Sequence, residues 1–238
     1  MSSFNWDENF RLNVARGKVR GASVRNIFGF NQATGTTVRT LWELANTTDY
    51  LFPSQGRNLT VASDVGDTSD DGVQVRLIGL DENYEEIAET VTINNATPPV
   101  TTNAFFRIND FITVSGNATG NITANYLTTT HARITAGRGR NQASVYTVPA
   151  GCQFYLFRID AFMNDASAAK PGLFRNKVTL PNGTILRVAD TPYLNQMNIK
   201  RDFPFKYDEK TDIELQIATL SGTTYAGVFG EGLVIKEQ

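Results

Sequence analysis

The sequence contains very few of the residues on which most catalytic and metal sites depend. Its 238 residues include one cysteine, Cys152, and one histidine, His131. One cysteine excludes an intrachain disulfide, and one Cys with one His cannot complete a typical tetrahedral zinc site. A Ser-His-Asp or Cys-His arrangement would have to use His131, and there is no Gly-X-Ser-X-Gly elbow. We predict no enzyme activity, no cofactor and no metal ligand, with Cys152 a buried inert thiol and His131 a surface or interdomain residue.

Long apolar runs and an excess of positive charge are missing as well. No apolar stretch is long enough to cross a membrane, and the N-terminal residues MSSFNWDENF lack the basic-then-apolar pattern of a signal peptide. The formal net charge is −2, whereas binding to the phosphate backbone of nucleic acids generally needs a basic surface. We therefore expect a chain made in a cytoplasm, with neither a membrane nor nucleic acid as its partner.

The charge is nevertheless unevenly distributed along the chain. Residues 1–40 lean basic, and residues 64–89 are strongly acidic. The two regions either hold neighbouring copies together or form two solvated faces. The loop at 64–72, DVGDTSDDG, has closely spaced carboxylates of the kind that bind Ca²⁺. Its spacing does not fit the EF-hand pattern, so a solvated turn is the alternative.

What the chain has in quantity is period-two patterning, which is typical of β-strands. In the segment 144–163, SVYTVPAGCQFYLFRIDAFM, the Pro-Ala-Gly at 149–151 predicts a tight turn joining two strands. One face of the second strand is expected to be its core face: Tyr155, Phe157, Ile159, Ala161 and Met163. The opposite face begins apolar too, with Cys152, Phe154 and Leu156, so this half of the strand should be covered on both sides.

The same alternation and turn signals predict further strands along the chain. Residues 73–80 and 84–93 predict a hairpin, and Pro-Asn-Gly at 181–183 is a strong hairpin turn signal. Near the C-terminus Ile213, Leu215 and Ile217 alternate with polar residues. Many short strands with regularly spaced turns predict an all-β protein of β-sandwich or jelly-roll type with little helix.

The organisation predicted from these patterns is an extended N-terminal arm and two β domains. The arm is residues 1–21, the first β-sandwich domain is 22–130, and the jelly-roll-like second domain is 131–238, after a Gly-rich break. The arm mixes large aromatic and basic residues, which suits a segment that docks on a neighbouring subunit, although a frayed terminus is the alternative. The candidate interface residues are Phe4, Trp6, Phe10, Arg11, Arg16, Lys18 and Arg20.

Several segments resemble virion proteins of tailed bacteriophages, especially marine phages. The resemblance lies in 75–93 (VRLIGLDENYEEIAETVTI) with 100–103 (VTTN) and 106–108 (FRI). The turn 146–151 (YTVPAG) with its following strand, and 210–215 (KTDIEL), are similar to the C-terminal part of the same proteins. The similarity is one of folding pattern, so no functional residue is carried over.

This resemblance implies β-sandwich or jelly-roll modules that decorate or cement the phage head, or that belong to tail and fibre assemblies. The leading hypothesis is a head decoration (cement) protein, a homotrimer on the virion surface that clamps adjacent major capsid subunits through the arm and one sheet edge or face. The second is a tail or fibre protein that recognises host surface glycan. A glycan-degrading enzyme is the least favoured, because nothing in the sequence nominates two carboxylates that converge across a cleft.

Overall fold

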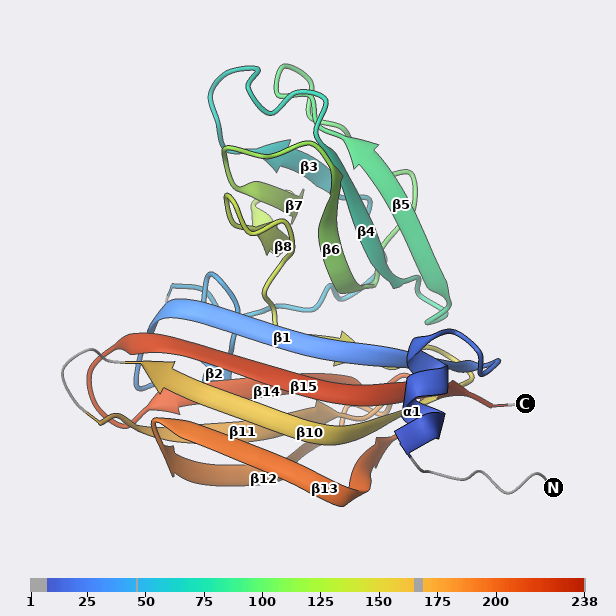
Figure 1. Cartoon of the computed structure of the whole chain (residues 1–238). Coiled ribbons are helices and arrows are strands. Elements are labelled where there is room, and N and C mark those ends of the chain that lie inside the picture. The colour runs from blue at the N-terminus through green and yellow to red at the C-terminus, as the bar shows by residue number, and fades with distance from the viewer. Residues whose placement is uncertain (1–7, 46, 165–168, 238) are drawn as a thin grey trace.

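The computed structural model describes residues 8–45, 47–164 and 169–237 and confirms the all-β prediction. Strands hold 56% of the chain and helix 3%. Figure 1 shows two stacked β bodies, a large two-layered sandwich and a smaller one above it, with a short helix at one end of the large sandwich. Phe4 and Trp6 of the expected arm lie outside the described residues. No helix in the described ranges is long and apolar enough to cross a membrane.

The large body is a jelly roll. Its strands are β1 (Ala22–Thr34), β2 (Arg39–Thr40), β9 (Val145–Thr147), β10 (Cys152–Asn164), β11 (Pro171–Thr179), β12 (Ile185–Leu194), β13 (Gln196–Tyr207), β14 (Asp212–Thr219) and β15 (Thr224–Lys236). They pair in the order β1-β15-β10-β13-β12-β11-β14-β2, and β9 also pairs with β14. When β2 and β9 are counted as two pieces of one strand, the jelly roll has eight strands in chain order. Its ladders then join the first strand to the eighth, the second to the seventh, the third to the sixth and the fourth to the fifth. That nesting is the double Greek key of a jelly roll.

The nine strands fold into two layers because β12 and β13 share only the pair Leu194↔Gln196, where the chain passes from one layer to the other. One layer is β1-β15-β10-β13 and the other is β12-β11-β14 with β2 and β9. The core between the layers draws buried apolar side chains from both, among them Phe154 and Val228 from the first and Phe174 and Leu215 from the second. Burying these faces against each other is what holds a sandwich together.

The smaller body is inserted into the second strand of the jelly roll. Its strands form two three-stranded sheets: β3 (Thr60–Ser63), β7 (Ile122–Tyr126) and β8 (Thr129–Ile134) in one, and β5 (Glu86–Thr92), β4 (Gln74–Leu80) and β6 (Arg107–Ser115) in the other. The two sheets share a core that includes Val61, Leu77 and Phe111. The predicted hairpin at 73–93 is confirmed as β4 and β5.

The chain leaves the jelly roll and returns to it at one point. The Ser144 backbone N–H donates to the Leu41 carbonyl at 2.8 Å, and the Ser144 hydroxyl donates to the Leu215 carbonyl at 2.5 Å. A Cβ at Gly29 would lie 2.5 Å from the Leu41 carbonyl oxygen and 2.6 Å from the Ser144 Cβ, so glycine permits the close approach. The insertion therefore interrupts one β-strand without disturbing its ladder to β14.

This pairing divides the chain differently from the sequence prediction. The predicted boundary between 22–130 and 131–238 falls inside β8, and β1 and β2 pair with strands of the C-terminal half instead of with the first domain. Strand patterns are local, whereas β1 and β15 pair across about 200 residues, and local alternation carries no information on such partners.

The predicted turn at 149–151 forms, but the two strands that it joins do not pair with each other as a hairpin. The Cys152 N–H donates to the Pro149 carbonyl at 3.2 Å, and Gly151 adopts φ +65°. β9 then pairs with β14, whereas β10 pairs with β13 and β15. The turn is a corner that takes the chain from one layer of the sandwich to the other.

The face assignment on β10 is also wrong for two residues. The core face carries Phe154, Leu156, Ile159, Ala161 and Met163. Leu156 pairs with Gly232 and Arg158 with Glu231, so Phe157 is an extra residue with no partner on β15. Such a bulge changes which residues of the strand share a face. Tyr155 and Phe157 consequently lie on the outer face. The first half of β10 is covered on both sides, as expected, whereas Arg158 and Phe162 farther along the strand are exposed.

The outer cover of β10 is the helix α1 (Glu8–Ala15), so this part of the expected extended arm is helical. Phe10 and Val14 pack with Phe157 and Leu233. Their spacing of four residues places them on one helical face. The helix occupies the end of the jelly roll seen in Figure 1.

The helix ends in a Schellman motif. The Lys18 N–H donates to the Asn13 carbonyl and the Gly17 N–H to the Val14 carbonyl, both at 2.9 Å, with Gly17 at φ +68°. Glycine tolerates this left-handed conformation without a steric penalty. The spacing of Phe10 and Val14 followed by Gly17 is the signal from which the helix could have been predicted.

The two bodies are joined by a buried ion pair between Arg107 of β6 and Asp212 of β14. The Arg107 Nε and Nη2 donate to the two Asp212 oxygens at 2.8 and 2.9 Å, and the two side chains are 8% and 9% exposed. Arg107 Nη1 donates to the Pro53 and Phe106 carbonyls at 3.0 and 2.8 Å. The Thr147 hydroxyl donates to Asp212 at 2.6 Å. Almost all hydrogen-bonding capacity of both charges is thereby satisfied inside the protein.

Beside the ion pair, backbone and amide hydrogen bonds connect the two bodies. The Asn109 Nδ2 donates to the Thr147 carbonyl at 2.9 Å, and the Thr147 N–H donates back to Asn109 Oδ1 at 2.8 Å. The Ala150 N–H donates to the Tyr84 carbonyl at 2.9 Å. Arg25 of β1 donates to the Asn109 carbonyl. The two sandwiches are therefore fixed relative to each other.

Removing either partner of the buried ion pair should destabilise the protein strongly. We expect Arg107→Ala or Asp212→Ala to lower the free energy of unfolding by about 3–5 kcal/mol, because each leaves a buried charge uncompensated. Urea unfolding followed by circular dichroism measures the loss. The matched control is Arg158→Ala, whose pair with Asp160 is half-exposed and should change stability by about 0–1 kcal/mol. Equal effects of Arg107→Ala and Arg158→Ala would contradict the assignment.

Candidate functional site

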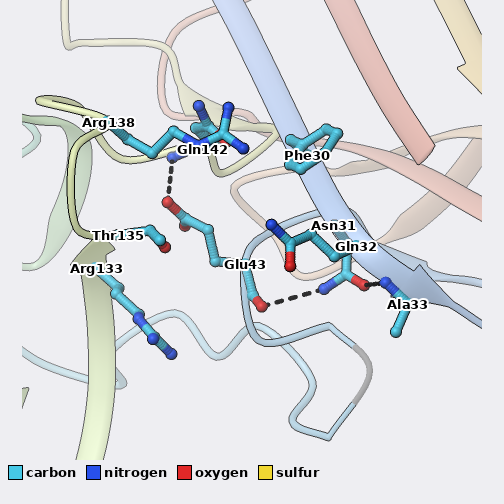
Figure 2. A pocket seen from close by; sticks show the side chains of 9 residues that line it. All are labelled: Phe30, Asn31, Gln32, Ala33, Glu43, Arg133, Thr135, Arg138 and Gln142. Atoms are coloured by element: carbon cyan, nitrogen blue, oxygen red, sulfur yellow. Dashed lines mark hydrogen bonds between the residues drawn. The ribbon is translucent and has the colours of Figure 1, made fainter. Parts of the chain in front are cut away.

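A cavity of about 230 Å³ lies where the two bodies meet. Figure 2 shows that its walls come from separate parts of the chain: Phe30 and Asn31 from β1, Glu43 from the segment after β2, Arg133 from β8, and Arg138 and Gln142 from the segment that returns to the jelly roll. Interdomain cavities lined by a few converging polar groups are a common setting for ligand binding. None of these residues was predicted as a site, because they converge only when the two bodies dock.

Glu43 lies at the centre of this cavity. Its carboxylate accepts a hydrogen bond from the Gln142 N–H at 3.2 Å, and its carbonyl accepts one from the Asn31 amide at 3.1 Å (Figure 2). Burial raises the pKa of the Glu43 carboxyl to about 7, against the smaller opposing effects of the Gln142 hydrogen bond and the charge of Arg133. A carboxyl with such a pKa exchanges its proton near neutral pH.

Three residues that line the cavity each carry one buried polar atom without a hydrogen-bond partner in the protein. Ten buried side-chain nitrogen or oxygen atoms among the described residues have no hydrogen-bond partner in the protein, and three of them belong to lining residues: Glu43 Oε2, Arg133 Nε and Gln142 Oε1. At the rim, the exposed Arg138 places its guanidinium 5.1 Å from the centre of the Phe30 ring. Buried polar groups are ordinarily satisfied, and the other seven exceptions are spread over the rest of the described chain, so such atoms are not confined to the cavity.

A second candidate surface is the open side of the jelly roll along β12 and β13. Outside their single shared pair, the facing edges of these strands have no ladder partner among the described residues. Five large apolar side chains are exposed on the two strands: Ile185 (59%), Leu186 (43%), Val188 (37%), Leu194 (58%) and Phe203 (84%). The opposite side of the jelly roll, at β1, is covered by the inserted body (Figure 1). Exposed apolar patches and unpaired strand edges are features of protein interaction sites.

The predicted interface residues of the N-terminal segment are placed in two groups. Phe10 is half-buried in the contact with Phe157, and the Arg11 guanidinium lies 4.4 Å from the centre of the Phe157 ring. Arg16, Lys18 and Arg20 follow the helix and are exposed. The described part of the segment is therefore anchored on its own jelly roll and presents a basic surface beside it.

The acidic loop at 64–72 is tied into the small body through its carboxylates. Asp70 is fully buried and accepts hydrogen bonds from the Ser63 hydroxyl, from the N–H and hydroxyl of Thr119, and from the Gly120 N–H, at 2.5–3.0 Å. Burial alone would raise the pKa of Asp70, but these hydrogen bonds hold it below its ordinary value. Asp64 accepts from Asn121. Within the described ranges, no group of three or more His, Cys, Asp or Glu residues is placed to hold a metal ion.

Cys152 and His131 are both buried. The predicted burial of Cys152 is confirmed, and burial raises the pKa of its thiol, which lowers the fraction of reactive thiolate. Burial likewise lowers the pKa of His131, whose Nδ1 lies 3.0 Å from the carbonyl of Leu51, in the segment that leads into the small body. His131 is therefore not a surface residue, and its ring contacts the segment that leads into the small body.

Comparison with known proteins does not assign the chain to a family. No family model matches the sequence, and no curated protein matches it. Among solved structures, the chain is similar to those of the Gt and Gx strains of infectious bursal disease virus, with 10% and 13% identity and TM-scores of 0.21 and 0.22. The alignments cover 91% and 90% of this chain and 73% and 71% of those chains. Such scores do not establish a common fold, so the jelly-roll topology rests on the strand pairing alone.

The raised pKa of Glu43 predicts a pH-dependent stability. The folded protein holds this proton more tightly than the unfolded chain, so the stability it contributes is fully present below about pH 4.5. That stability is lost as the pH rises to about 7, by ~3 kcal/mol in total. Glu43→Gln removes the titration, so the difference in unfolding free energy between the variant and the wild type should shift toward the variant by that amount between pH 5 and pH 8. Urea unfolding at the two pH values measures it, and a difference independent of pH would contradict the burial of this carboxyl.

Proposed function

We propose that this protein is a non-enzymatic structural component of a virion, and more specifically a head decoration (cement) protein that binds adjacent major capsid subunits. The sequence resemblance to tailed-phage virion proteins supports this class. The observation that carries the proposal is the open side of the jelly roll, where five exposed apolar side chains lie on two strand edges. A decoration protein acts by burying such a surface against its neighbours.

The rigidity of the molecule suits this role. The Arg107–Asp212 pair and its neighbouring hydrogen bonds fix the two bodies relative to each other, so a contact made by the jelly roll presents the inserted body in a defined direction. Many copies on a symmetric particle add avidity to each contact. We propose a homotrimer as the assembled form, made in the host cytoplasm and located on the head surface.

The N-terminal segment is the second contact in this proposal. Arg16, Lys18 and Arg20 are exposed next to the anchored helix, and Phe4 and Trp6 precede it in the chain. A basic surface with neighbouring aromatic residues favours an acidic partner surface and supplies apolar anchors. Arg11 and Phe10 set the position of this segment through their contacts with Phe157.

A tail or fibre protein that recognises host surface glycan is the second candidate function. The observation that favours it is the polar cavity between the two bodies, because decoration of a capsid makes no use of that cavity. Imaging of virions that carry a labelled copy of this protein separates the two candidates. Label on the head supports decoration, and label confined to the tail overturns it.

Replacing the exposed apolar side chains should abolish capsid binding without unfolding the protein. We expect the double variant Leu194→Ser with Phe203→Ser to bind capsids of the same virus at least about tenfold more weakly, since each buried apolar side chain contributes ~1.5–3 kcal/mol. Co-sedimentation with capsids measures the loss. Leu127→Ser is the matched control, because Leu127 is 82% exposed on the small body, away from β12 and β13.

The same assay tests the basic segment. Reversing the three exposed charges (Arg16→Glu, Lys18→Glu and Arg20→Glu) should weaken binding most at low salt, because screening already reduces the attraction at high salt. Capsid binding that is unchanged in both the apolar and the charge-reversal variants would exclude these surfaces as the contact.

A further inference from the structure

The core of the jelly roll is incompletely closed on the side of β12 and β13. On β12, Leu186 pairs with Val178 of β11, and directly paired residues of an antiparallel ladder share one face of the sheet. Val178 is buried in the core, whereas Leu186 is 43% exposed. The core face therefore continues onto β12, where the described part of the chain leaves it partly uncovered.

A groove follows this uncovered face. Its volume is about 470 Å³, within the range of about 300–1,000 Å³ that holds drug-sized ligands. Its apolar walls include Val178 of β11, Leu186 and Val188 of β12, and Phe205 and Tyr207 of β13. Phe205 and Tyr207 also pack in the core cluster. An apolar group placed in this groove would therefore extend the existing core.

The backbone edge beside the groove is available for a further strand. Apart from the pair Leu194↔Gln196, the edge of β12 that faces β13 has no ladder partner among the described residues. The edge of β13 is a poorer template, because residues 201–204 have no partner on β10 and include Pro204, which lacks an N–H. An extended segment can pair with β12 through its backbone while alternate side chains enter the groove.

The charges on the two strands favour an acidic segment. Two charged side chains of β12 and β13 are already held in ion pairs. The exposed charges without an ion-pair partner in the described part of these strands are three positive side chains and one carboxylate: Arg187, Lys200, Arg201 and Asp202. Glu209, which also lines the groove, accepts a hydrogen bond from the Gly151 N–H at 2.6 Å. The balance is positive and attracts a partner that carries acidic side chains.

The same charges argue against a second copy of this chain as the occupant. In a two-fold contact each surface meets its own counterpart. The positive side chains of the two copies would then lie together, and like charges facing each other across an interface are unfavourable. A partner with acidic side chains avoids this repulsion.

We propose that this side of the jelly roll binds an extended segment of a major capsid subunit in which apolar and acidic side chains alternate. The segment adds as a strand to the free edge of β12 and places its apolar side chains in the groove. Its acidic side chains then lie on the side of Arg187, which follows Leu186 and so points to the outer face. This inference rests on the proposed function, from which it takes the capsid as the source of the segment.

Peptide binding to the full chain tests the proposal without capsids. The probe is a capped peptide of about eight residues, an ordinary strand length, in which valine alternates with glutamate. We expect saturable shifts in NMR spectra of the protein, with a dissociation constant of about 0.1–1 mM. The matching valine–lysine peptide should bind at least about tenfold more weakly. A valine–glutamate peptide that is N-methylated at every residue keeps its side chains, and its loss of backbone donors should weaken binding to a similar extent.

Three variants locate the site. Leu186→Asp places a charge in the groove and should weaken binding of the valine–glutamate peptide at least about tenfold. The double variant Arg187→Glu with Lys200→Glu should reverse the preference between the glutamate and lysine peptides. Leu127→Asp adds a carboxylate to the small body, at a side chain that is 82% exposed, and should change neither peptide. The altered side chains are all exposed, and retained circular dichroism spectra show that the variants are folded.

The peptide and capsid assays separate this inference from the proposed function. Capsid binding that depends on Leu194 and Phe203, without saturable peptide binding at about 5 mM, overturns strand addition and leaves the capsid contact in place. Peptide binding that N-methylation leaves unchanged also overturns it. Binding to phosphatidylserine vesicles without binding to the valine–glutamate peptide overturns it in favour of an anionic membrane surface. Peptide binding without capsid binding supports strand addition at β12 and overturns the proposed function instead.

Discussion

The arrangement of this protein depends on a charge pair that is almost completely removed from water. Burying Arg107 and Asp212 is unfavourable unless each finds its partner in good geometry, and here both arginine–carboxylate hydrogen bonds form while backbone carbonyls and the Thr147 hydroxyl satisfy most of what remains. Arg107 belongs to the inserted body and Asp212 to the jelly roll. Any rotation of one body against the other would separate the two charges and leave each of them buried without its partner. The pair therefore selects one docked arrangement.

The position of the insertion gives this pair its effect. The small body leaves and re-enters the jelly roll within one β-strand, at Leu41 and Ser144, where backbone hydrogen bonds hold the two connections side by side. These two connections, held side by side, and a buried ion pair together leave the inserted body little freedom. The cavity around Glu43 follows from that restraint, since it is built from residues on the two sides of the junction.

The two sides of the jelly roll consequently differ in how far they are covered. At β1 the sandwich is covered by the chain's own inserted body, whereas the β12 and β13 edges retain exposed apolar side chains. Only one of the two sides is therefore open for contact with another molecule. The polar cavity and the apolar edge are separate features that share no residue.

Local patterns in the chain predict the class of fold, the hairpin at 73–93, the turn at 181–183 and the inward face of Ile213, Leu215 and Ile217, because alternation of side chains and turn chemistry are local properties of the backbone. Long-range packing sets which strands pair, that β9 and β10 lie in opposite layers, and that the bulge at Phe157 places two aromatic residues under a helix. It also decided that Asp212 is buried and that Glu43 and Arg138 meet at one cavity. These outcomes depend on which surfaces, distant in sequence, are buried against each other. The free energy of that burial is a property of the whole chain and not of any single segment.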